Sequence, residues 1–232
     1  MSDDALVPIT FDAKKLVLAP EGVLLWPDYN LLVVSDLHLE KGAALSKGAP
    51  LPQFDTIDTI QRLKDACDRY KPSHIVCLGD SFHTVSGAFQ MPAPYLESLQ
   101  ELATDRRLTW ITGNHDEQLP DRLPGEVLAS WEQDGIIFTH EADPQAKTPM
   151  ISGHFHPKAR VKLRARALSA PCFVQTPHHL IMPSFGSYTG GLNILHEALS
   201  AFLSQQTICH LIHQNRLYSL PFDKRVFVKS AA

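Results

Sequence analysis

Short apolar runs separated by turn signals predict strands in the first third of the chain. Three such runs, at 16–18, 23–26 and 31–35, are divided by Pro-Glu-Gly and Pro-Asp-Tyr-Asn. The third run begins Leu-Leu-Val-Val without polar alternation, which is typical of a strand that is covered on both faces. We therefore expect this strand to lie inside a sheet that is packed on two sides.

After residue 53 the apolar residues recur every three or four positions, which is the spacing of a helix. Phe54, Ile57 and Ile60 recur at helical spacing, which Leu63 and Cys67 continue, so the pattern predicts a helix over 54–70 that ends before Pro72. The next elements predicted are a strand at 74–78, a helix at 95–103 and a strand at 108–112. This alternation of strand and helix predicts parallel strands that are joined by crossover helices.

The second half of the chain leaves little room for helices between its apolar runs. The strands predicted here are 127–131, 136–140, 150–153, 160–163, 173–175 and 180–182. Residues 192–203 predict a partial helix, and 208–212 with 216–220 predict a hairpin around Gln214-Asn215. Two sheets packed face to face with helices outside would cover all of these elements.

Composition and charge narrow the class of protein. A length of 232 residues favours one larger domain, 1–232, and 44% hydrophobic with 20% charged residues excludes a disordered chain. No run reaches the ~18 apolar residues of a membrane span, and Asp3 and Asp4 stand where a secretory signal carries positive charge. We expect a soluble, cytoplasmic protein without a membrane partner. The net charge of −4 exerts no global attraction on nucleic acid.

The chain has 12 histidines, and several of them follow predicted strands together with aspartate or asparagine. The four cysteines are scattered without a CxxC pair, which argues against a disulfide framework or a thiolate zinc site. The five polar sets after the strands are Asp36 with His38, Asp80, Asn114-His115-Asp116, His140, and His154 with His156. In open α/β sheets the carboxyl ends of the strands form the ligand-binding edge, so these sets are predicted to meet at one rim.

Oxygen and imidazole ligands without cysteine suit divalent cations of intermediate hardness, such as manganese, iron or zinc. The candidate ligands are Asp36, His38, Asp80, Asn114, His140, His154 and His156. Seven ligands exceed what one ion needs. If Asp80 bridges, two cations can share the set, and a water held between them would lose its proton near neutral pH and attack a phosphoester in line.

In chain order, Asp36-x-His38, Gly79-Asp80, Gly113-Asn114-His115-Asp116, His140 and Gly153-His154-x-His156 resemble the five blocks of the calcineurin-like metallophosphoesterase superfamily. The resemblance implies a four-layer α/β/β/α fold, a double β-sandwich with flanking helices. It also implies a first metal held by Asp36, His38, Asp80 and His156, and a second held by Asp80, Asn114, His140 and His154. The fourth block departs from many relatives, because Thr139 stands where they have glycine.

Further motifs resemble a bacterial subfamily of these enzymes, PdeM, which is associated with an Lhr-type helicase and an ATP-dependent DNA ligase. These motifs are Leu37-His38-Leu39-Glu40-Lys41-Gly42, Phe82-His83, Pro171-Cys172-Phe173 and Phe185-Gly186-x-x-Thr189-Gly190-Gly191. The resemblance implies a manganese-dependent phosphodiesterase with DNA endonuclease activity in DNA repair, acting with two divalent ions on nucleic acid, with single-stranded DNA expected.

Three side chains near the ligands are candidates for other steps. His115 is surplus to the ligand set and is predicted to be the general acid, with Asp116 orienting its ring. His83 follows Asp80 by three residues and could contact a substrate phosphate, although a loop-stabilising role is equally open. The other six histidines, at 74, 178, 179, 196, 210 and 213, are expected to be ordinary core or surface residues.

Cations alternate with small or apolar residues over 158–166, directly after His156. They are Lys158, Arg160, Lys162, Arg164 and Arg166, and on a strand they would share one face. Such a row suits a polyanionic phosphodiester, so Lys158, Arg160 and Lys162 are candidate substrate contacts. A charged edge strand that resists aggregation explains the same pattern.

Three other functions remain open at this point. The chain could be a phosphatase or phosphodiesterase that acts on small nucleotides with the same metals. It could be a metal-bearing scaffold without catalysis, although no ligand and neither His115 nor Asp116 is missing. It could also be a regulatory module of a repair complex whose own activity is weak.

Overall fold

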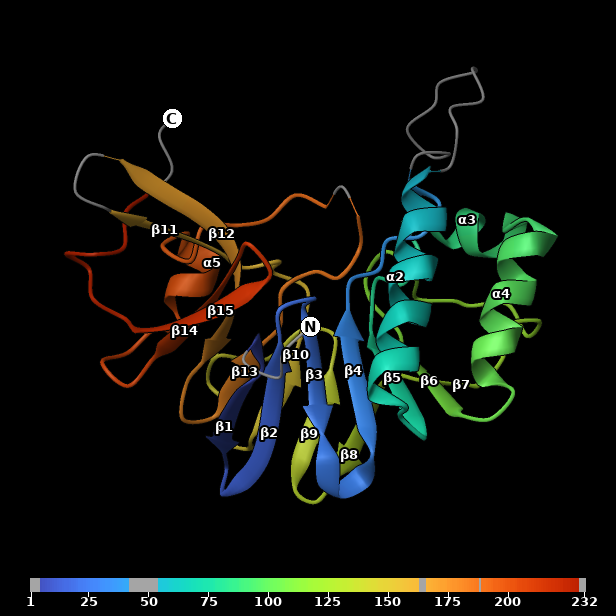
Figure 1. The fold of residues 1–232 in the computed structure, drawn as a ribbon, viewed down its shortest axis with the longest axis horizontal. Helices are drawn as coiled ribbons and strands as arrows, with labels where there is room; N and C mark the ends of the chain where they lie inside the picture. Colours follow the sequence, from blue (N-terminus) through green and yellow to red (C-terminus); the bar gives the residue numbers. More distant parts are fainter. Residues whose placement is uncertain (1–4, 42–53, 163–165, 188, 230–232) are drawn as a thin grey trace.

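Two β-sheets pack face to face in the computed structural model, which describes residues 5–41, 54–162, 166–187 and 189–229 (Figure 1). The first sheet has the strand order β1-β2-β3-β4-β5-β6-β7. The second has the order β15-β14-β12-β13-β10-β9-β8, with β11 paired to β12. The expectation of two layered sheets is therefore confirmed.

The first sheet is antiparallel from β1 to β4 and parallel from β4 to β7. Its strands are β1 Val7–Phe11, β2 Lys14–Ala19, β3 Val23–Trp26, β4 Leu31–Ser35, β5 His74–Leu78, β6 Arg107–Ile111 and β7 Glu126–Leu128. The parallel strands and the fully buried β4 agree with the sequence pattern. β1 was not predicted: its apolar positions alternate as in a half-buried strand, but Pro8 stands among them, and proline is rare inside strands.

The second sheet is mixed, with β9, β10 and β13 parallel and the remaining pairs antiparallel. Its strands are β8 Ser130–Gln133, β9 Ile136–Thr139, β10 Met150–Ser152, β11 Lys158–Lys162, β12 Ala167–Gln175, β13 His179–Ile181, β14 Ile208–His213 and β15 Arg216–Pro221. The hairpin β14–β15 turns at Gln214 and Asn215, which have φ angles of 50° and 57°. Two left-handed residues are the signature of a type I′ turn, so the predicted hairpin is confirmed.

One predicted strand, 127–131, is wrong as a single element. The chain divides it at Ala129 into β7, which pairs with β6 in the first sheet, and β8, which pairs with β9 in the second. Both strands lie at sheet edges and alternate between exposed and partly buried residues, so no change in the pattern marks the boundary between them. Hydropathy alone therefore could not show that the chain crosses between the sheets here.

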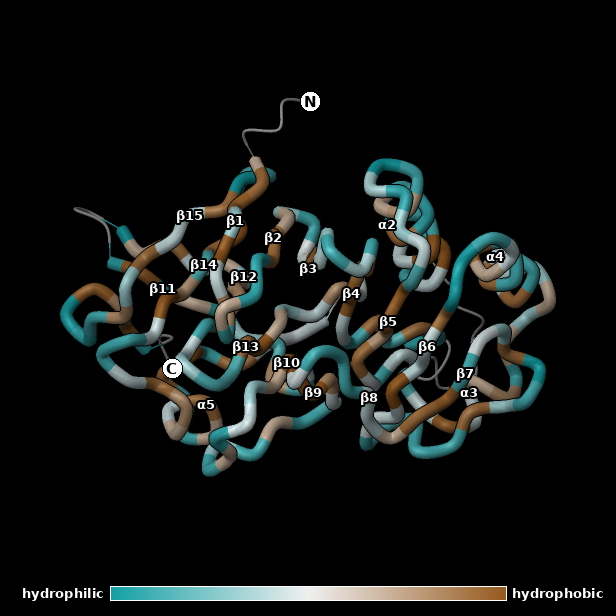
Figure 2. The backbone as a smooth tube through the Cα atoms, turned by 90° about the horizontal axis from the view of Figure 1, so that it is seen from below, coloured by the Kyte–Doolittle hydropathy of each residue, from teal (hydrophilic) through white to brown (hydrophobic). Residues whose placement is uncertain are grey.

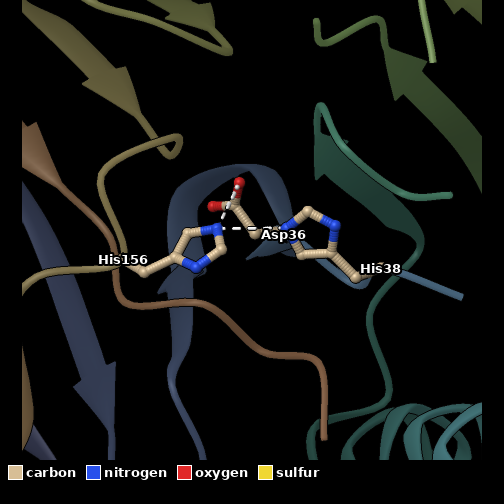
Figure 3. Close-up of side chains that lie close together, drawn as sticks. All are labelled: Asp36, His38 and His156. Carbon is tan, nitrogen blue, oxygen red and sulfur yellow. Dashed lines mark hydrogen bonds and ion pairs between the residues drawn. The ribbon is translucent and has the colours of Figure 1, made fainter. Parts of the chain in front are cut away.

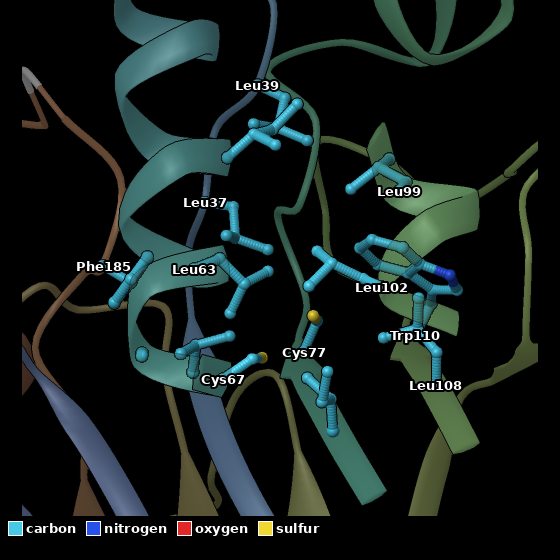
Figure 4. Close-up of a cluster of buried hydrophobic side chains, with 14 of the residues drawn as sticks. Leu37, Leu39, Leu63, Cys67, Cys77, Leu99, Leu102, Leu108, Trp110 and Phe185 are labelled. Atoms are coloured by element: carbon cyan, nitrogen blue, oxygen red, sulfur yellow. The ribbon is translucent and has the colours of Figure 1, made fainter. Parts of the chain in front are cut away.

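Two helices, α2 Phe54–Tyr70 and α4 Ala93–Ala103, cover the outer face of the first sheet. Figure 4 shows Leu63 and Cys67 of α2 and Leu102 of α4 packed around Cys77 of β5. Ile57 lies outside this core with 49% of its surface exposed, although its spacing fits the apolar stripe. The described residues also contain the short elements η2 Pro27–Tyr29, α3 Val85–Gln90 and α5 Glu197–Ser200.

Three hydrophobic layers alternate with the sheets and define a mixed α/β fold of the four-layer type. The first lies between α2, α4 and the first sheet, and the second lies between the sheets, where Val33 and Val76 meet Phe138 and Ile151. The third lies between the second sheet, α5 and the segment around Phe227. In Figure 2 the strands are mainly brown and many of the loops teal, as this layering requires. Among the described residues, no helix combines the length and apolarity that a bilayer crossing needs.

Candidate metal centre

The carboxyl ends of β4, β5 and β10 and the loops after β6 and β9 bring the predicted ligands together. Two groups form, and within each group the ligand atoms lie within 4.8 Å of one another. The first group is Asp36, His38 and His156, and the second is Asp80, His140 and His154. Residues from positions 36 to 156 therefore meet at one rim, as the sequence predicted.

In the first group, Nε2 of His156 lies 3.2 Å from Oδ1 of Asp36 and 3.2 Å from Nε2 of His38 (Figure 3). Burial lowers the pKa of His38 to about 4, so its ring is neutral and can act as a ligand at neutral pH. The Asp36 carboxylate is fully buried and accepts hydrogen bonds from the Ser35 hydroxyl and from the backbone N–H of His154. These bonds fix the direction in which the carboxylate faces.

In the second group, Nε2 of His140 is the central atom. It lies 3.4 Å from Oδ2 of Asp80, 3.0 Å from Oδ1 of Asn114 and 3.1 Å from Nδ1 of His154. The other nitrogen, Nδ1, donates to the Leu78 carbonyl oxygen at 3.2 Å, which leaves Nε2 facing the group. Asn114 thus joins the second group, as the resemblance implied, whereas bridging by Asp80 stays a prediction.

The electrostatics of the second group fit a cation. Burial alone would lower the pKa of His140, but Asp80 and Asp36 outweigh it and raise this pKa to about 9. Burial would raise the pKa of Asp80, yet His140 lowers it to about 2. The two carboxylates thus favour positive charge at His140, and a divalent ion bound there would supply the same compensation in place of the proton.

Several of the ligands have a left-handed backbone. Asp36, His38, Asp80, His154 and His156 all have positive φ angles, between 44° and 69°. Left-handed backbone costs a non-glycine residue of order 1–3 kcal/mol and persists where the surrounding structure over-determines it, as in functional sites. Crowding adds to this, since a Cβ on Gly113 would collide with Asp80 and one on Gly153 with Ser35.

The structure corrects the predicted pairing of His115 with Asp116. Nδ1 of His115 donates to the main-chain carbonyl oxygen of His83 at 2.9 Å, and Nε2 lies 4.0 Å from Oδ2 of Asp80. The buried carboxylate of Asp116 instead accepts from the backbone N–H groups of Gly113, Asp80 and Phe82 at 2.7–3.2 Å. Asp116 thus ties the loop after β5 to the loop after β6, and the ring of His115 is oriented by a carbonyl group.

His83 lies beside His115, with their rings stacked at 21° and their centroids 5.3 Å apart. Its ring is also 5.7 Å from that of His38. Its Nδ1 is buried and has no hydrogen-bond partner among the described residues. The side chain is therefore at the rim, next to the predicted general acid, and its role as a substrate contact stays a prediction.

The basic row is shorter than expected. Lys158, Arg160 and Lys162 lie on β11 and point away from the buried Ala159 and Val161, so the predicted alternation is present. The strand ends at Lys162, however, and the exposed Arg166 precedes β12, so the five cations do not share one strand; Arg164 lies outside the described residues. Arg160 donates to the Lys229 carbonyl oxygen at 3.1 Å.

Two neighbours of the ligands were missed by the sequence pattern. The Glu141 carboxylate lies 3.7 Å from Nε2 of His154, the nitrogen that faces away from His140. Ser35 supports Asp36 through its hydroxyl. Both are adjacent in sequence to ligands, and adjacency was the only signal that could have identified them.

Comparisons with known proteins agree with this geometry. The profile of the calcineurin-like phosphoesterase superfamily domain matches residues 29–169, more than half of the chain. The structure of the nuclease MPE from Pseudomonas putida has a TM-score of 0.73 and 27% identity, covering 93% of this chain and all of that one. The phosphoesterase YfcE of E. coli has a TM-score of 0.45 and 14% identity, covering 83% and 99%.

No curated protein sequence matches the chain significantly. The resemblance that the five motif blocks indicated is nevertheless confirmed, because the matched residues 29–169 contain every predicted metal ligand. With the two ligand groups at the rim, the superfamily match identifies a metal-dependent phosphoester hydrolase. The chain belongs to the calcineurin-like phosphoesterase superfamily.

Proposed function

We propose that the protein hydrolyses phosphodiester bonds in DNA as a manganese-dependent endonuclease of bacterial DNA repair. The observation that carries the proposal is the pair of adjoining ligand groups at one rim, where Nδ1 of His140 lies 3.9 Å from Oδ1 of Asp36. The similarity to a nuclease over 93% of the chain supports nucleic acid as the substrate class.

The chain's own residues would hold the two ions as follows: Asp36, His38 and His156 the first, and Asp80, Asn114, His140 and His154 the second. When bound, two divalent cations neutralise charge on the phosphoryl oxygens and lower the pKa of a shared water. Asn114 and the carboxylates offer oxygen, and the four histidines offer nitrogen, His140 after release of its extra proton, which is a donor set that manganese accepts.

His115 is positioned to protonate the leaving oxygen. Since a carbonyl oxygen can only accept, the bond to His83 requires the proton on Nδ1 and leaves Nε2 directed toward the rim. The protonated ring would then donate from Nε2. The side chain is 41% exposed, so a substrate oxygen can reach it, unlike the buried Asp116. We assign the general-acid role to His115 and a loop-bracing role to Asp116.

Two further contacts would select a polyanion. The ring of His83 stacks on His115 and can face a phosphate next to the scissile one. Lys158, Arg160 and Lys162 leave the rim on β11, two to six residues after the ligand His156. A row of cations beside the metals attracts successive phosphates of a strand, which a small nucleotide does not offer.

Metal reconstitution tests the proposal. The protein would be stripped of metal, restored separately with manganese, magnesium, zinc or iron, and assayed on a simple phosphodiester, a phosphomonoester and circular single-stranded DNA. We expect manganese to restore cleavage of the diester and of the circle, because only internal cleavage opens a circle. Activity confined to the monoester, or to cyclic or other small nucleotides, would overturn the proposed function.

The cellular setting follows from the subfamily motifs. We expect the enzyme to act in the cytoplasm together with an ATP-dependent DNA ligase and an Lhr-type helicase. Purification of a tagged chain from cells exposed to DNA damage, followed by identification of bound proteins, measures this association. Recovery of neither partner, with the nuclease activity intact, would limit the proposal to the reaction itself.

A further inference from the structure

The backbone around Asp36 is held from outside by a segment distant in sequence. The N–H of Phe185 donates to the Ser35 carbonyl oxygen at 2.7 Å, and that of Gly186 donates to the Asp36 carbonyl oxygen at 3.1 Å. A Cβ on Gly186 would collide with the Leu37 carbonyl oxygen, so the contact is backbone against backbone. Residues 185–187, here called the strap, thus lie directly on the loop that carries two first-group ligands.

That loop requires external support. Asp36 and His38 have φ angles of 53° and 45°, a conformation that local interactions disfavour in aspartate and histidine. Such strain persists only where neighbouring groups fix the backbone. The strap supplies two of those bonds, and the Gly79 carbonyl oxygen supplies a third by accepting from the Asp36 N–H at 3.3 Å.

Arg62 of α2 in turn fixes the strap. Its Nη1 donates to the Phe185 carbonyl oxygen at 2.8 Å and to the Ser187 hydroxyl at 3.4 Å, and its guanidinium lies 4.6 Å from the centre of the Phe185 ring. Its Nη2 donates to the Glu21 carbonyl oxygen at 3.3 Å. Figure 4 shows Phe185 beside α2, on the side away from Cys77.

The environment of Arg62 is unusual for a surface-helix arginine. The side chain is half-buried, burial lowers its pKa, and the bonds given above all go to carbonyl or hydroxyl oxygens. The nearby carboxylates of Asp58 and Glu21 offset part of the cost of burying this charge, but the oxygens that the guanidinium binds in the strap are neutral. Its five rigid donors suit the bridging of several backbone oxygens, which a lysine cannot reproduce.

We propose that Arg62 is a positioning residue for the first ligand group: it holds the strap against the strained loop and thereby sets the direction of the Asp36 carboxylate. The inference rests on the proposed metal centre. It concerns the first group directly, because the hydrogen bonds of the strap within the described part of the chain go to the Asp36 loop, to α2 and to Thr189, and none joins the strap to the second ligand group. The second group is affected through Asp36, which accepts from the backbone N–H of His154.

Manganese binding to three variants tests this role. Arg62→Met removes every donor, and Arg62→Lys retains the charge with one donor group. Arg69→Met is the matched control, because Arg69 lies two turns later on α2 and also contacts Glu21, but through the Glu21 carboxylate. Binding would be followed by calorimetry and by the magnetic resonance signal of a coupled manganese pair, with His156→Ala and His154→Ala identifying the two binding steps.

We expect Arg62→Met to weaken the step lost in His156→Ala by about 10–100-fold, the usual effect of removing outer support for a metal ligand. The other step should weaken much less, Arg62→Lys should be intermediate, and Arg69→Met should match the wild type. If Arg62→Met does not fold, manganese binding to Arg62→Lys tests the inference instead. Unchanged binding of both ions, or equal weakening of both, would overturn the inference. Failure of the wild type to bind two ions would instead overturn the proposed function.

Discussion

Histidines at the rim and histidines in the core have different partners, even where both are buried, as His38 and His140 at the rim are as buried as His74 and His210 in the core. At the rim, ring nitrogens face one another or carboxylates, as His156 faces His38 and Asp36. In the core, Nε2 of His74 lies 2.9 Å from the Thr109 hydroxyl, and His210 contacts the Ser219 hydroxyl at 2.7 Å and the Gln175 amide oxygen at 3.1 Å.

Neutral hydroxyl and amide partners satisfy a neutral imidazole completely, so the core histidines are structural polar residues. At the rim one ring nitrogen faces several acceptors: Nε2 of His156 lies next to Oδ1 of Asp36 and Nε2 of His38, and it has at most one proton to donate between them. Such a cluster is completed by a cation or a proton. The difference shows that the partners of a buried histidine, and not its burial, indicate its chemistry.

The largest expected effect separates the two kinds of histidine directly. His140→Ala removes the central nitrogen of the second ligand group, and we expect turnover to fall by about 10³-fold or more, equivalent to several kcal/mol of transition-state charge stabilisation. The matched change in the core, His210→Gln, should leave turnover per folded molecule within a few-fold of wild type. Steady-state kinetics and manganese titration measure both. Similar losses in both variants would erase the distinction.

His115 is at the rim but is not a predicted ligand. His115→Ala should retain both manganese steps and lose about 10²–10⁴-fold in kcat on DNA, whose leaving alkoxide needs a proton. On a p-nitrophenyl diester the loss should be small, because that leaving group departs as a stable anion. Parallel kcat measurements on the two substrates check this, and an equal loss on both would indicate a positioning role.

Stability of the metal-free protein should depend on pH in opposite senses for the core histidines and for His140 at the rim. Burial lowers the pKa of His74 and of His210 to about 4, so below ~6.5 the unfolded chain binds protons that the folded chain cannot. Each should therefore remove about 3 kcal/mol as the pH falls from ~6.5 to ~4. Urea unfolding across this range measures it, with His210→Gln losing part of the dependence.

His140 has the opposite sign. Its pKa is raised to about 9, so its contribution is fully present below ~6.5 and is lost as the pH rises through about 9. Unfolding of metal-free His140→Ala should lack this alkaline decline. If the decline persists in that variant, the carboxylate environment assigned to His140 is incorrect.

Asp116 tests how the rim is braced. Asp116→Asn keeps the shape but replaces an oxygen acceptor by a donor facing backbone N–H groups, so we expect about 1–3 kcal/mol lower unfolding free energy. The acidic and basic limbs of the pH–rate profile should keep their positions, because His115 is oriented by the His83 carbonyl group. A shift in the pKa of the limb assigned to His115 would instead support the predicted pairing of His115 with Asp116.

The smallest effect concerns binding outside the rim. Charge reversal of Arg160 and Lys162 should leave kcat on a small diester unchanged, weaken cleavage of DNA, and lower the slope of log affinity against log salt by about one for each phosphate contact that is lost. Salt titrations of DNA binding measure that slope. An unchanged slope would show that the row on β11 is only a solvated strand face.

Much of the first sheet could be predicted from the sequence, because an apolar run there coincides with one buried strand or helix. The strand at 31–35 and the helix at 54–70 agree with the structure to the residue, since turn residues and Pro72 punctuate them. The strand at 127–131 failed because both halves lie at half-exposed sheet edges, where hydropathy carries no record of which sheet a strand joins.

The candidate site divides in the same way. Residue types alone indicated the seven ligands and the general acid, because Asp, Asn and His immediately after buried strands have few structural uses. The left-handed backbone at Asp36, the carbonyl partner of His115 and the support from Arg62 depend on contacts between residues far apart in the chain. No local pattern encodes such contacts.

The amino-acid sequence by itself determined the layered α/β class, the superfamily and the identity of the metal-ligand candidates, because these follow from periodicity and from residue types at strand ends. Only the tertiary structure decided which histidines share a cation site and which are satisfied by neutral groups. It also decided that Asp116 braces two loops and that Arg62 holds a third. Those assignments depend on the burial and the hydrogen-bond partners of each side chain, and both are set by contacts between residues that are distant in the sequence.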